Sequence, residues 1–378
     1  MRLFEKIVGD GITFDDVLIV PARTSIKKTD PTTDVVLHNR LRLKIPIISS
    51  PMDTVTGGYM AIAMAQEGGL GILHRGMKHA DKVGTVKLVK HQESNLKKSA
   101  IDEHGRLVVG VAIGMVGDDE KEYLHQISQL LLAGADCLLI DTAHGDSDYM
   151  VKTVEILKTE FPKCILICGN VATASAAKTL IDAGADILRV GIGGGSICTT
   201  RIVTGVGVPQ LTAIDEVRSA IEESGKPVTL IADGGIRQAG DICKALAVGA
   251  DAVMLGGMLG GTEETPGETI ILDGGTKAKV YRGMGSLDAI AGDGGRYHEG
   301  KDKSEIVSEG VVAHVPFKGP VAGILRQLVG SLKSSMFYVG AKDLKEFADA
   351  VLLVRASQNS LRESHPSHRS VGIERNYF

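Results

Sequence analysis

The sequence predicts an α/β fold of the (β/α)8 TIM-barrel class, as one domain that covers residues 1–378. Three observations predict it: eight short apolar runs separated by helical stretches, a Gly-Ala-Asp segment that recurs three times, and small or polar residues at the ends of the runs. A chain of 378 residues is longer than most single domains, but barrels with insertions reach this length. An open, doubly wound sheet is the alternative.

The eight apolar runs are the predicted strands. Near-continuous apolar runs are typical of parallel strands buried on both faces, and eight such units close into a barrel. The runs are Ile45–Ser49, Gly69–His74, Leu107–Ala112, Cys137–Asp141, Ile165–Gly169, Ile187–Val190, Val228–Asp233 and Ala252–Leu255. Because aromatic residues make up 4% of the chain and tryptophan is absent, we expect an aliphatic core.

The recurring segment marks the passage from a helix to the next strand. Ala133–Asp136, Ala183–Asp186 and Val248–Asp251 each follow a helical stretch and precede an apolar run. Glycine favours a helix C-terminus because it adopts positive φ without a steric cost. We therefore expect the glycine of each copy to end its helix.

The strand ends are where a site is expected, since the loops after barrel strands converge on one face. These ends read Ser49–Asp53, Asp141–Gly145, Gly169–Asn170, Gly191–Cys198, Asp233–Gly235 and Gly256–Gly257. Glycine-rich turns expose backbone N–H groups that bind anions. The segments at 195–196, 235 and 256–257 are therefore predicted to surround one phosphate without any lysine. The Asp233 carboxylate suits the two vicinal hydroxyls of a ribose.

Composition argues against several classes of protein. The net charge is −4 and no long basic block occurs, so we expect no nucleic-acid partner. No apolar stretch approaches the roughly 20 residues of a membrane span, and no signal peptide is apparent, so a cytoplasmic protein is expected. The five cysteines are scattered and odd in number, which is typical of reduced thiols.

Cys198 is the candidate nucleophile. It lies outside the apolar strands, in the polar segment Gly193–Arg201. A thiolate attacks electron-poor carbon when nearby donors or positive charge lower its pKa. From local sequence alone, a catalytic thiol and a buried loop thiol remain equally open. No P-loop occurs, and no G-x-G-x-x-G follows the first strand, so a dinucleotide would bind without the Rossmann device.

Two polar segments follow the last predicted strand. An insertion at about 282–310 starts in Tyr281–Ser286 and contains Arg296 and Tyr297. A segment of this length and glycine content is typical of a lid or a linker, and we interpret it as an active-site flap. The tail at about 356–378 is expected either to dock on a neighbouring subunit or to be a frayed terminus.

In the cysteine loop and in the segments after the last predicted strand, the chain resembles the superfamily of IMP dehydrogenases and GMP reductases. The resemblance runs from the Ile12–Leu18 segment to the C-terminus, and Gly195–Arg201 resembles the shared catalytic loop. Three segments resemble the dehydrogenase branch: Tyr281–Ser286, residues 261–268 and the Arg296-Tyr297 pair. The resemblance implies NAD-dependent oxidation of IMP to XMP, a step of guanine nucleotide biosynthesis. A GMP reductase that uses NADPH and a non-catalytic barrel that binds a purine nucleotide are the alternatives.

The resemblance also implies roles for single residues. Cys198 adds to C2 of the hypoxanthine, hydride leaves for NAD, and a thioimidate remains. Arg296, aided by Tyr297, then activates water, while Thr200 and Glu309 form a second proton relay. The implied contacts to IMP are Ser50, Met52, Ser196, Asp233, Gly235, Gly256, Gly257, Tyr281, Gly283, Met284, Gly285 and Glu309.

Further positions match cofactor and metal contacts of the family. Those implied for the dinucleotide, or for the loop around it, are Asp141, Asn170, Arg189 and Gly191. A potassium ion is implied at the carbonyl groups of Gly193, Gly195 and Cys198, completed by Glu363, Ser364 and His365 of a neighbouring chain. This shared site implies a homotetramer.

Two departures from the family pattern stand out. Gly194 occupies a position that is commonly proline in bacterial relatives, which suggests a looser catalytic loop and a weaker potassium dependence. Most relatives also carry a tandem CBS regulatory pair where this chain has only the stretch from about Lys87 to Arg106. That stretch is too short to fold such a pair, so we expect no CBS domain.

Overall fold

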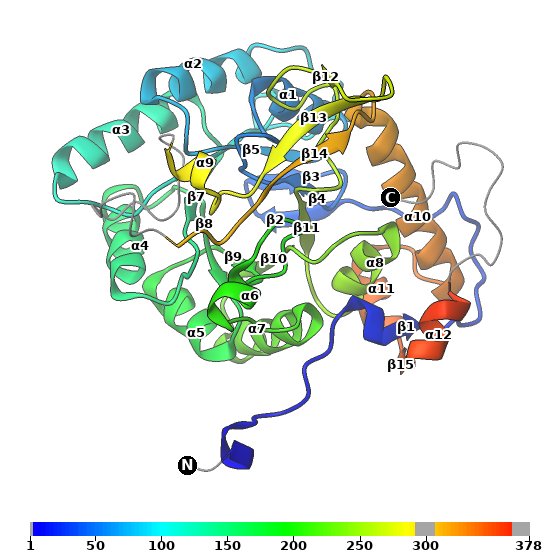
Figure 1. Ribbon diagram of the computed structural model, residues 1–378. Coiled ribbons are helices and arrows are strands. Elements are labelled where there is room, and N and C mark those ends of the chain that lie inside the picture. Colours follow the sequence, from blue (N-terminus) through cyan, green and yellow to red (C-terminus); the bar gives the residue numbers. More distant parts are fainter. Residues whose placement is uncertain (1–2, 292–306, 365–378) are drawn as a thin grey trace.

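A closed barrel of eight parallel strands forms the centre of the molecule (Figure 1). The computed structural model describes residues 3–291 and 307–364. The barrel strands are β4 (Ile47–Ser49), β5 (Leu70–Leu73), β6 (Gly110–Ile113), β7 (Cys137–Asp141), β8 (Leu166–Val171), β9 (Ile187–Val190), β10 (Thr229–Asp233) and β11 (Ala252–Leu255). Pairing of β11 with β4 closes the ring. The predicted barrel is confirmed, and the open sheet is wrong.

Helices cover the outside of the barrel (Figure 1). They are α1 (Gly58–Gln66), α2 (His79–Lys90), α3 (Glu120–Ala133), α4 (Asp148–Glu160), α5 (Ala174–Ala183), α7 (Gln210–Ser224), α8 (Ala239–Ala247), α10 (Val321–Val339) and α11 (Leu344–Ala350). The side chains of Asp119, Ser147 and Thr173 accept N–H bonds in the first turns of α3, α4 and α5. These caps satisfy donors that a helix N-terminus otherwise leaves unpaired.

Shorter elements surround the barrel. The strands are β1 (Val17–Ile19), β2 (Val35–His38), β3 (Leu41–Leu43), β12 (Ile270–Ile271), β13 (Lys277–Arg282), β14 (Val312–Pro316) and β15 (Leu353–Arg355). The short helices are η1 (Leu3–Lys6), η2 (Phe14–Asp16), α6 (Thr200–Thr204), α9 (Leu287–Ala291) and α12 (Gln358–Glu363). The antiparallel pair of β13 and β14 joins Arg282 to Val312, so the predicted flap begins at one end of this sheet.

The three Gly-Ala-Asp segments share one structural role. In each, the aspartate accepts a backbone N–H from the neighbouring strand and pairs with a basic side chain of a helix. The sets are Asp136 with Val109 and Lys90, Asp186 with Leu166 and Lys158, and Asp251 with Leu230 and Arg218. The segments therefore fasten helices to the starts of the strands.

The glycines of these segments behave as expected in two copies. Gly134 and Gly184 are the left-handed C-caps of α3 and α5. The expectation that Gly249 ends its helix is wrong. Helix α8 has Val248 as its C-cap, one residue before Gly249, and Val248 is in right-handed helical geometry. Gly249 follows with a φ of 118°, so the reversal lies one residue outside the helix.

The connection between α2 and β6 carries no further domain. It spans residues 91–109, in which Ile101 and Leu107 form an isolated antiparallel bridge. The predicted strand at Leu107–Ala112 is therefore displaced, since β6 starts at Gly110. The expectation that no CBS pair fits here is confirmed.

The core is aliphatic, as expected. Cys137, Cys164, Cys168 and Cys243 are buried, whereas Cys198 is partly exposed. Among residues 3–291 and 307–364, no helix combines the length and the apolar character needed to cross a bilayer.

Candidate active site

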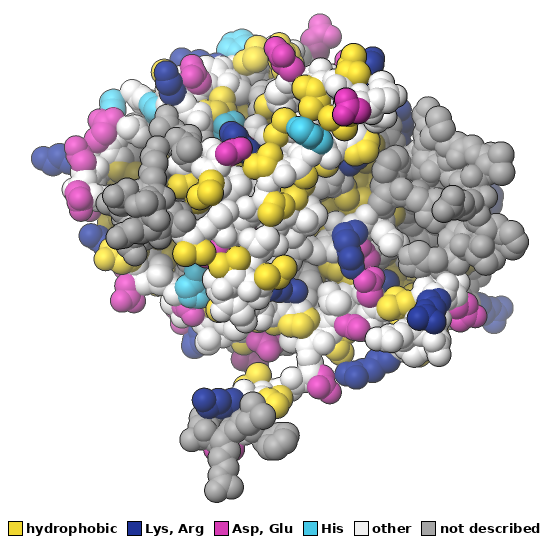
Figure 2. Space-filling view, in the orientation of Figure 1, with side chains coloured by type: hydrophobic (Ala, Val, Ile, Leu, Met, Phe, Trp, Pro, Cys, Tyr) yellow, Lys and Arg dark blue, Asp and Glu magenta, His cyan; other side chains and the backbone are white. Residues whose placement is uncertain are grey.

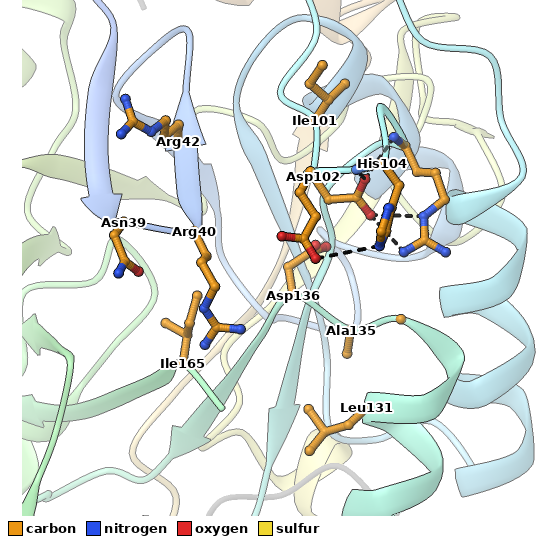
Figure 3. A pocket seen from close by; sticks show the side chains of 13 residues that line it. Asn39, Arg40, Arg42, Ile101, Asp102, His104, Leu131, Ala135, Asp136 and Ile165 are labelled. Carbon is orange, nitrogen blue, oxygen red and sulfur yellow. Dashed lines mark hydrogen bonds and ion pairs between the residues drawn. The ribbon is translucent and has the colours of Figure 1, made fainter. Parts of the chain in front are cut away.

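A pocket at the N-terminal ends of the strands contains two aspartates, Asp102 and Asp136, that are both bound to a lysine (Figure 3). Its volume is about 450 Å³. Arg40 and Arg42 lie on one side of it, and Asp102 and Asp136 lie on the other. Lys90 donates to both carboxylates at 3.1 and 2.7 Å. These groups are engaged in holding the barrel together, so this pocket is not the predicted site.

Two adjoining cavities lie at the C-terminal ends of the strands, where barrel enzymes have their active sites. Their volumes are about 360 and 420 Å³, and they share a wall that includes Ser50, Met52, Asp233 and Tyr281. All the residues predicted to contact the substrate line one or both cavities. On the face of α6, α9 and β13, the centre is mostly backbone and side chains that are neither charged nor hydrophobic, with scattered hydrophobic side chains (Figure 2). Charged side chains lie mostly toward its edge.

Cys198 lies at the junction of the catalytic loop and α6. Its Sγ is 3.1 Å from the hydroxyl oxygen of Thr200. The Thr200 hydroxyl donates to Glu309 Oε2 at 2.7 Å. Since the hydroxyl proton points to Glu309, the hydroxyl oxygen is oriented to accept from the thiol. The three groups form a path along which a proton can pass from sulfur to carboxylate.

Backbone bonds hold Glu309 against the cysteine loop. The Thr199 N–H donates to Glu309 O at 2.9 Å, and the Val311 N–H donates to Ile197 O at 3.0 Å. On its other side, the Glu309 N–H donates to Gly285 O at 3.0 Å. The end of the predicted flap is therefore tied to the cysteine loop and to the segment after β13.

Glycines after β11 leave room for close approach of a ligand. A Cβ on Gly256 would lie 2.9 Å from the Tyr281 hydroxyl, and one on Gly257 would lie 2.7 Å from Ser196 Oγ. Ser196 Oγ is 3.3 Å from the Tyr281 hydroxyl. Burial raises the pKa of Tyr281 to about 12, so its phenol stays protonated as a hydrogen-bond donor near neutral pH. Small residues and hydroxyl donors here suit an anionic group.

A buried ion network forms the wall next to Asp233. Arg189, on β9, contacts Asp141 at 2.6 Å and Asp233 Oδ2 at 2.9 Å. Asn170 donates to the same Asp233 oxygen at 2.9 Å and to Gly191 O at 2.7 Å. Within the described chain these side-chain bonds use Oδ2 of Asp233, so Oδ1 is the oxygen left for a ligand. Asp141 itself does not line the cavities and contacts them through Arg189.

The described members of the predicted metal site fall into two groups. Gly193 and Gly195 line the cavities, and the carbonyl of Gly195 accepts the Cys198 N–H at 3.1 Å. Glu363 and Ser364 lie at the end of α12 and do not line the cavities. His365, Arg296 and Tyr297 are outside the described residues. Over residues 3–291 and 307–364, no group of three or more His, Cys, Asp or Glu side chains is arranged to hold a metal.

Two polar residues of the site went unassigned in the sequence. Gln210, at the start of α7, is 1% exposed, and its amide donates to the carbonyls of Val190 and Asp233 at 2.8 and 3.2 Å. Arg201 donates to the carbonyls of Ile192 and Val208. Both act on backbone carbonyls, which every residue has, so no side-chain spacing reveals them.

Comparison with known proteins identifies close relatives of this chain. A family model described as "IMP dehydrogenase / GMP reductase domain" matches residues 11–368. The inosine-5'-monophosphate dehydrogenases of Aquifex aeolicus and Bacillus subtilis are each 38% identical, and each alignment covers 96% of both chains. That of Cryptosporidium parvum is 42% identical, over 95% of this chain and 96% of the relative.

The lengths of these alignments differ. The two bacterial alignments extend over 477 positions, more than the 378 residues of this chain, whereas the Cryptosporidium alignment extends over 392. The bacterial relatives therefore contain inserted sequence that this chain lacks.

Proposed function

Since the chain belongs to the IMP dehydrogenase and GMP reductase family, we propose that it oxidises IMP to XMP with NAD, through a covalent bond to Cys198. The observation that carries this proposal is the path from Cys198 through Thr200 to Glu309, with distances of 3.1 and 2.7 Å. It lies in the same pair of cavities as a glycine-rich anion site and a carboxylate that suits a ribose.

The cavities offer complementary groups to each part of IMP. The 5'-phosphate would lie at Ser196, Gly256, Gly257 and Tyr281, and Asp233 Oδ1 would accept from the ribose. All of these residues line the cavity of about 420 Å³. Cys198, Met284 and Gly285 line the adjoining cavity, where the hypoxanthine would lie. The sulfur then stands beside the carbon to be oxidised.

The reaction proceeds in two stages. The thiol proton passes toward Glu309 through Thr200, and the thiolate adds to C2 of the hypoxanthine. Hydride leaves C2 and a thioimidate to Cys198 remains; NAD, when bound, accepts that hydride. Water then gives up a proton, either to Arg296 as the resemblance implies or through Thr200 to Glu309, and adds to C2. The C–S bond breaks, so XMP is released and the thiolate of Cys198 is regenerated. One IMP, one NAD and one water give XMP, NADH and a proton.

The wall beside Cys198 fits a dinucleotide with polar groups. Asn170, Arg189 and Gly191 line the same cavity as the sulfur. Asn170 Oδ1 and Arg189 Nε are buried atoms without a hydrogen-bond partner in the described chain, and a polar ligand would satisfy them. These residues would hold the nicotinamide end of NAD beside C2, and the family resemblance supports the same assignment.

A potassium ion, a homotetramer and a cytoplasmic location belong to the same proposal. Glu363 and Ser364, at the end of α12, line neither cavity of their own chain, which supports the expectation that they complete a potassium site of a neighbouring copy. Carbonyl oxygens such as those of Gly193, Gly195 and Cys198 are suitable ligands for a hard cation. We expect a tetramer by light scattering, and a rate that rises when potassium replaces sodium; a monomer with full activity would contradict this.

One assay tests the proposed function. The protein is incubated with IMP and NAD, NADH is followed by its absorbance, and XMP is identified by chromatography. We expect both products in equal amounts. Oxidation of NADPH by GMP, with no NADH from IMP, would instead assign the GMP reductase activity. No reaction with either pair would favour a barrel that only binds nucleotides.

Replacing Arg296 by alanine is expected to slow hydrolysis about a hundredfold more than hydride transfer, because the resemblance assigns this residue to water activation. The pre-steady-state burst of NADH should therefore survive while the steady-state rate falls. Adding Glu309→Gln should lower the remaining rate further, since the Thr200 relay ends at this carboxylate. Stopped-flow absorbance measures both phases. Loss of the burst in the single variant would assign Arg296 to the redox step.

A further inference from the structure

Three consecutive backbone N–H groups in the turn after β11 have no acceptor in the described part of the chain. Those of Leu259 and Gly260 donate to Gly256 O at 3.0 and 2.9 Å, which makes residues 256–260 a single helical turn. For the N–H groups of Gly256, Gly257 and Met258, no acceptor occurs among residues 3–291 and 307–364. Gly256 and Gly257 line the cavity proposed for the phosphate. Free N–H groups at the start of a helical turn are suited to bind an anion.

A lysine lies at the other end of this turn. Lys318 follows β14, and its Nζ donates to the carbonyls of Gly257 and Met258 at 2.9 and 3.0 Å. Its backbone N–H donates to Gly261 O at 2.9 Å. The ammonium of Lys318 is therefore held by carbonyl groups of the same turn that has N–H groups without an acceptor.

The ammonium of Lys318 has no carboxylate partner in the part of the chain that the structure describes. The two cations that line the cavity proposed for the phosphate are engaged elsewhere: Arg201 donates to the carbonyls of Ile192 and Val208, and Arg237 pairs with Asp15. Lys318 is thus a cation close to the phosphate region whose charge no described anion offsets.

We propose that Lys318 is a positioning residue for the 5'-phosphate of the substrate. Its ammonium holds the carbonyls of Gly257 and Met258, so that the three free N–H groups keep the orientation that the phosphate requires, and it adds a positive charge behind them. This inference rests on the proposed function, because it takes a nucleoside monophosphate as the ligand. It also revises the expectation that no lysine takes part in holding the phosphate.

The charge of Lys318 is expected to change in the mildly alkaline range. Burial lowers the pKa of Lys318 to about 8. The charged and titratable groups on the neighbouring elements are Glu263 and Glu264 of the loop after β11, Lys277, Lys279, Tyr281 and Arg282 of β13, and His314 of β14. Burial raises the pKa of Tyr281 to about 12 and lowers that of Lys279, whose ammonium is bound to the carbonyls of Thr262, Glu263 and Thr265.

Loss of the Lys318 proton is expected to weaken the binding of the phosphate. The protonated ammonium attracts the phosphate, and deprotonation above about pH 8 removes that attraction. We therefore expect the affinity for a phosphate-bearing ligand to fall as the pH rises through this value, by about tenfold between about pH 7 and pH 9.5.

Calorimetric titration of IMP and of inosine into the Cys198→Ala variant tests the inference. This background prevents turnover and removes the titration of the thiol. Inosine has the same base and ribose, so ionisation of the base affects both ligands and cancels in the ratio of their dissociation constants. The dissociation constant of inosine divided by that of IMP measures the contribution of the phosphate to binding. We expect this phosphate contribution to fall about tenfold between about pH 7 and pH 9.5. A ratio that stays constant with pH would overturn the inference.

Two substitutions at Lys318 separate positioning from general stability. Lys318→Met should show the low phosphate contribution at every pH, whereas Lys318→Arg should show a high one at every pH, because a guanidinium does not deprotonate in this range. With Cys198 intact, Lys318→Met should raise KM for IMP about tenfold and leave kcat within about twofold, since the 5'-phosphate is held equally in the ground and transition states. An arginine variant that titrates like the parent would contradict the proposal, and this comparison holds even if the methionine variant does not fold.

Binding of IMP to the parent protein separates a failure of the proposed function from a failure of the role of Lys318. If the parent protein binds no IMP, the proposed function is wrong, and the comparison is repeated with whichever of GMP and AMP binds, against its own nucleoside. If no nucleoside monophosphate binds, the role of Lys318 is wrong as well. If IMP binds and the phosphate contribution is the same in the parent and in the Lys318 variants, the inference alone is overturned.

Discussion

Replacing Cys198 by alanine is expected to abolish turnover and to leave IMP bound. Without the sulfur no covalent bond forms at C2, so the rate of NADH formation should fall by more than about a thousandfold. The phosphate and ribose contacts proposed at Gly257 and Asp233 do not involve the thiol, so the dissociation constant for IMP should change little. Steady-state kinetics and calorimetry measure the two quantities.

Cys243 provides the matched control for this variant. It is buried in α8, and burial raises its pKa to about 11, so its thiol is neutral near pH 7. Cys243→Ala should therefore keep kcat, with at most a modest loss of stability. Turnover that persists in Cys198→Ala, or that disappears equally in Cys243→Ala, would remove the basis for a nucleophilic role of Cys198.

Replacing Arg189 by methionine is expected to lower the free energy of unfolding by about 3 kcal/mol, because one partner of a buried ion network is removed. Arg189 is 1% exposed and Asp141 is fully buried. The substitution also removes the contact that orients Asp233, so the affinity for IMP should fall. Urea unfolding followed by fluorescence or circular dichroism measures the loss of stability.

An exposed ion pair serves as the control for this effect. Lys345 and Asp349 are four residues apart on α11, and both side chains are largely exposed. Such pairs contribute little because solvent screens them. Lys345→Met should therefore produce no measurable change. A stability of Arg189→Met equal to or above that of the parent would show that the network serves binding and not folding.

The barrel was predictable because its strands are short, apolar and regularly spaced. The bounds of β7, β9 and β11 agree with the predicted runs, since these runs are buried on both faces and polar or small residues flank them. The bounds of β6 differ because Leu107 is as apolar as a strand residue but pairs with Ile101 outside the barrel. Hydrophobicity reports burial, and it does not report which neighbour a buried residue has.

The positions that line the site were predictable for a related reason. The loops after parallel strands meet at one face, so residues such as Ser50, Asp233 and Gly256 had to lie near one another. Glu309 was assigned only through the family resemblance, because 109 residues separate it from Thr200. Lys318 was missed, because its bonds go to backbone carbonyls and leave no pattern in the sequence.

The most direct test is to trap the enzyme during turnover of IMP and to locate the nucleotide by mass spectrometry. The Arg296→Ala variant is suited to this test, since slow hydrolysis should let the thioimidate accumulate. We expect the peptide that contains Cys198 to carry the oxidised nucleotide, and the four buried cysteines to be unmodified. NADH and XMP formed while the sulfur of Cys198 stays unmodified throughout would contradict the account.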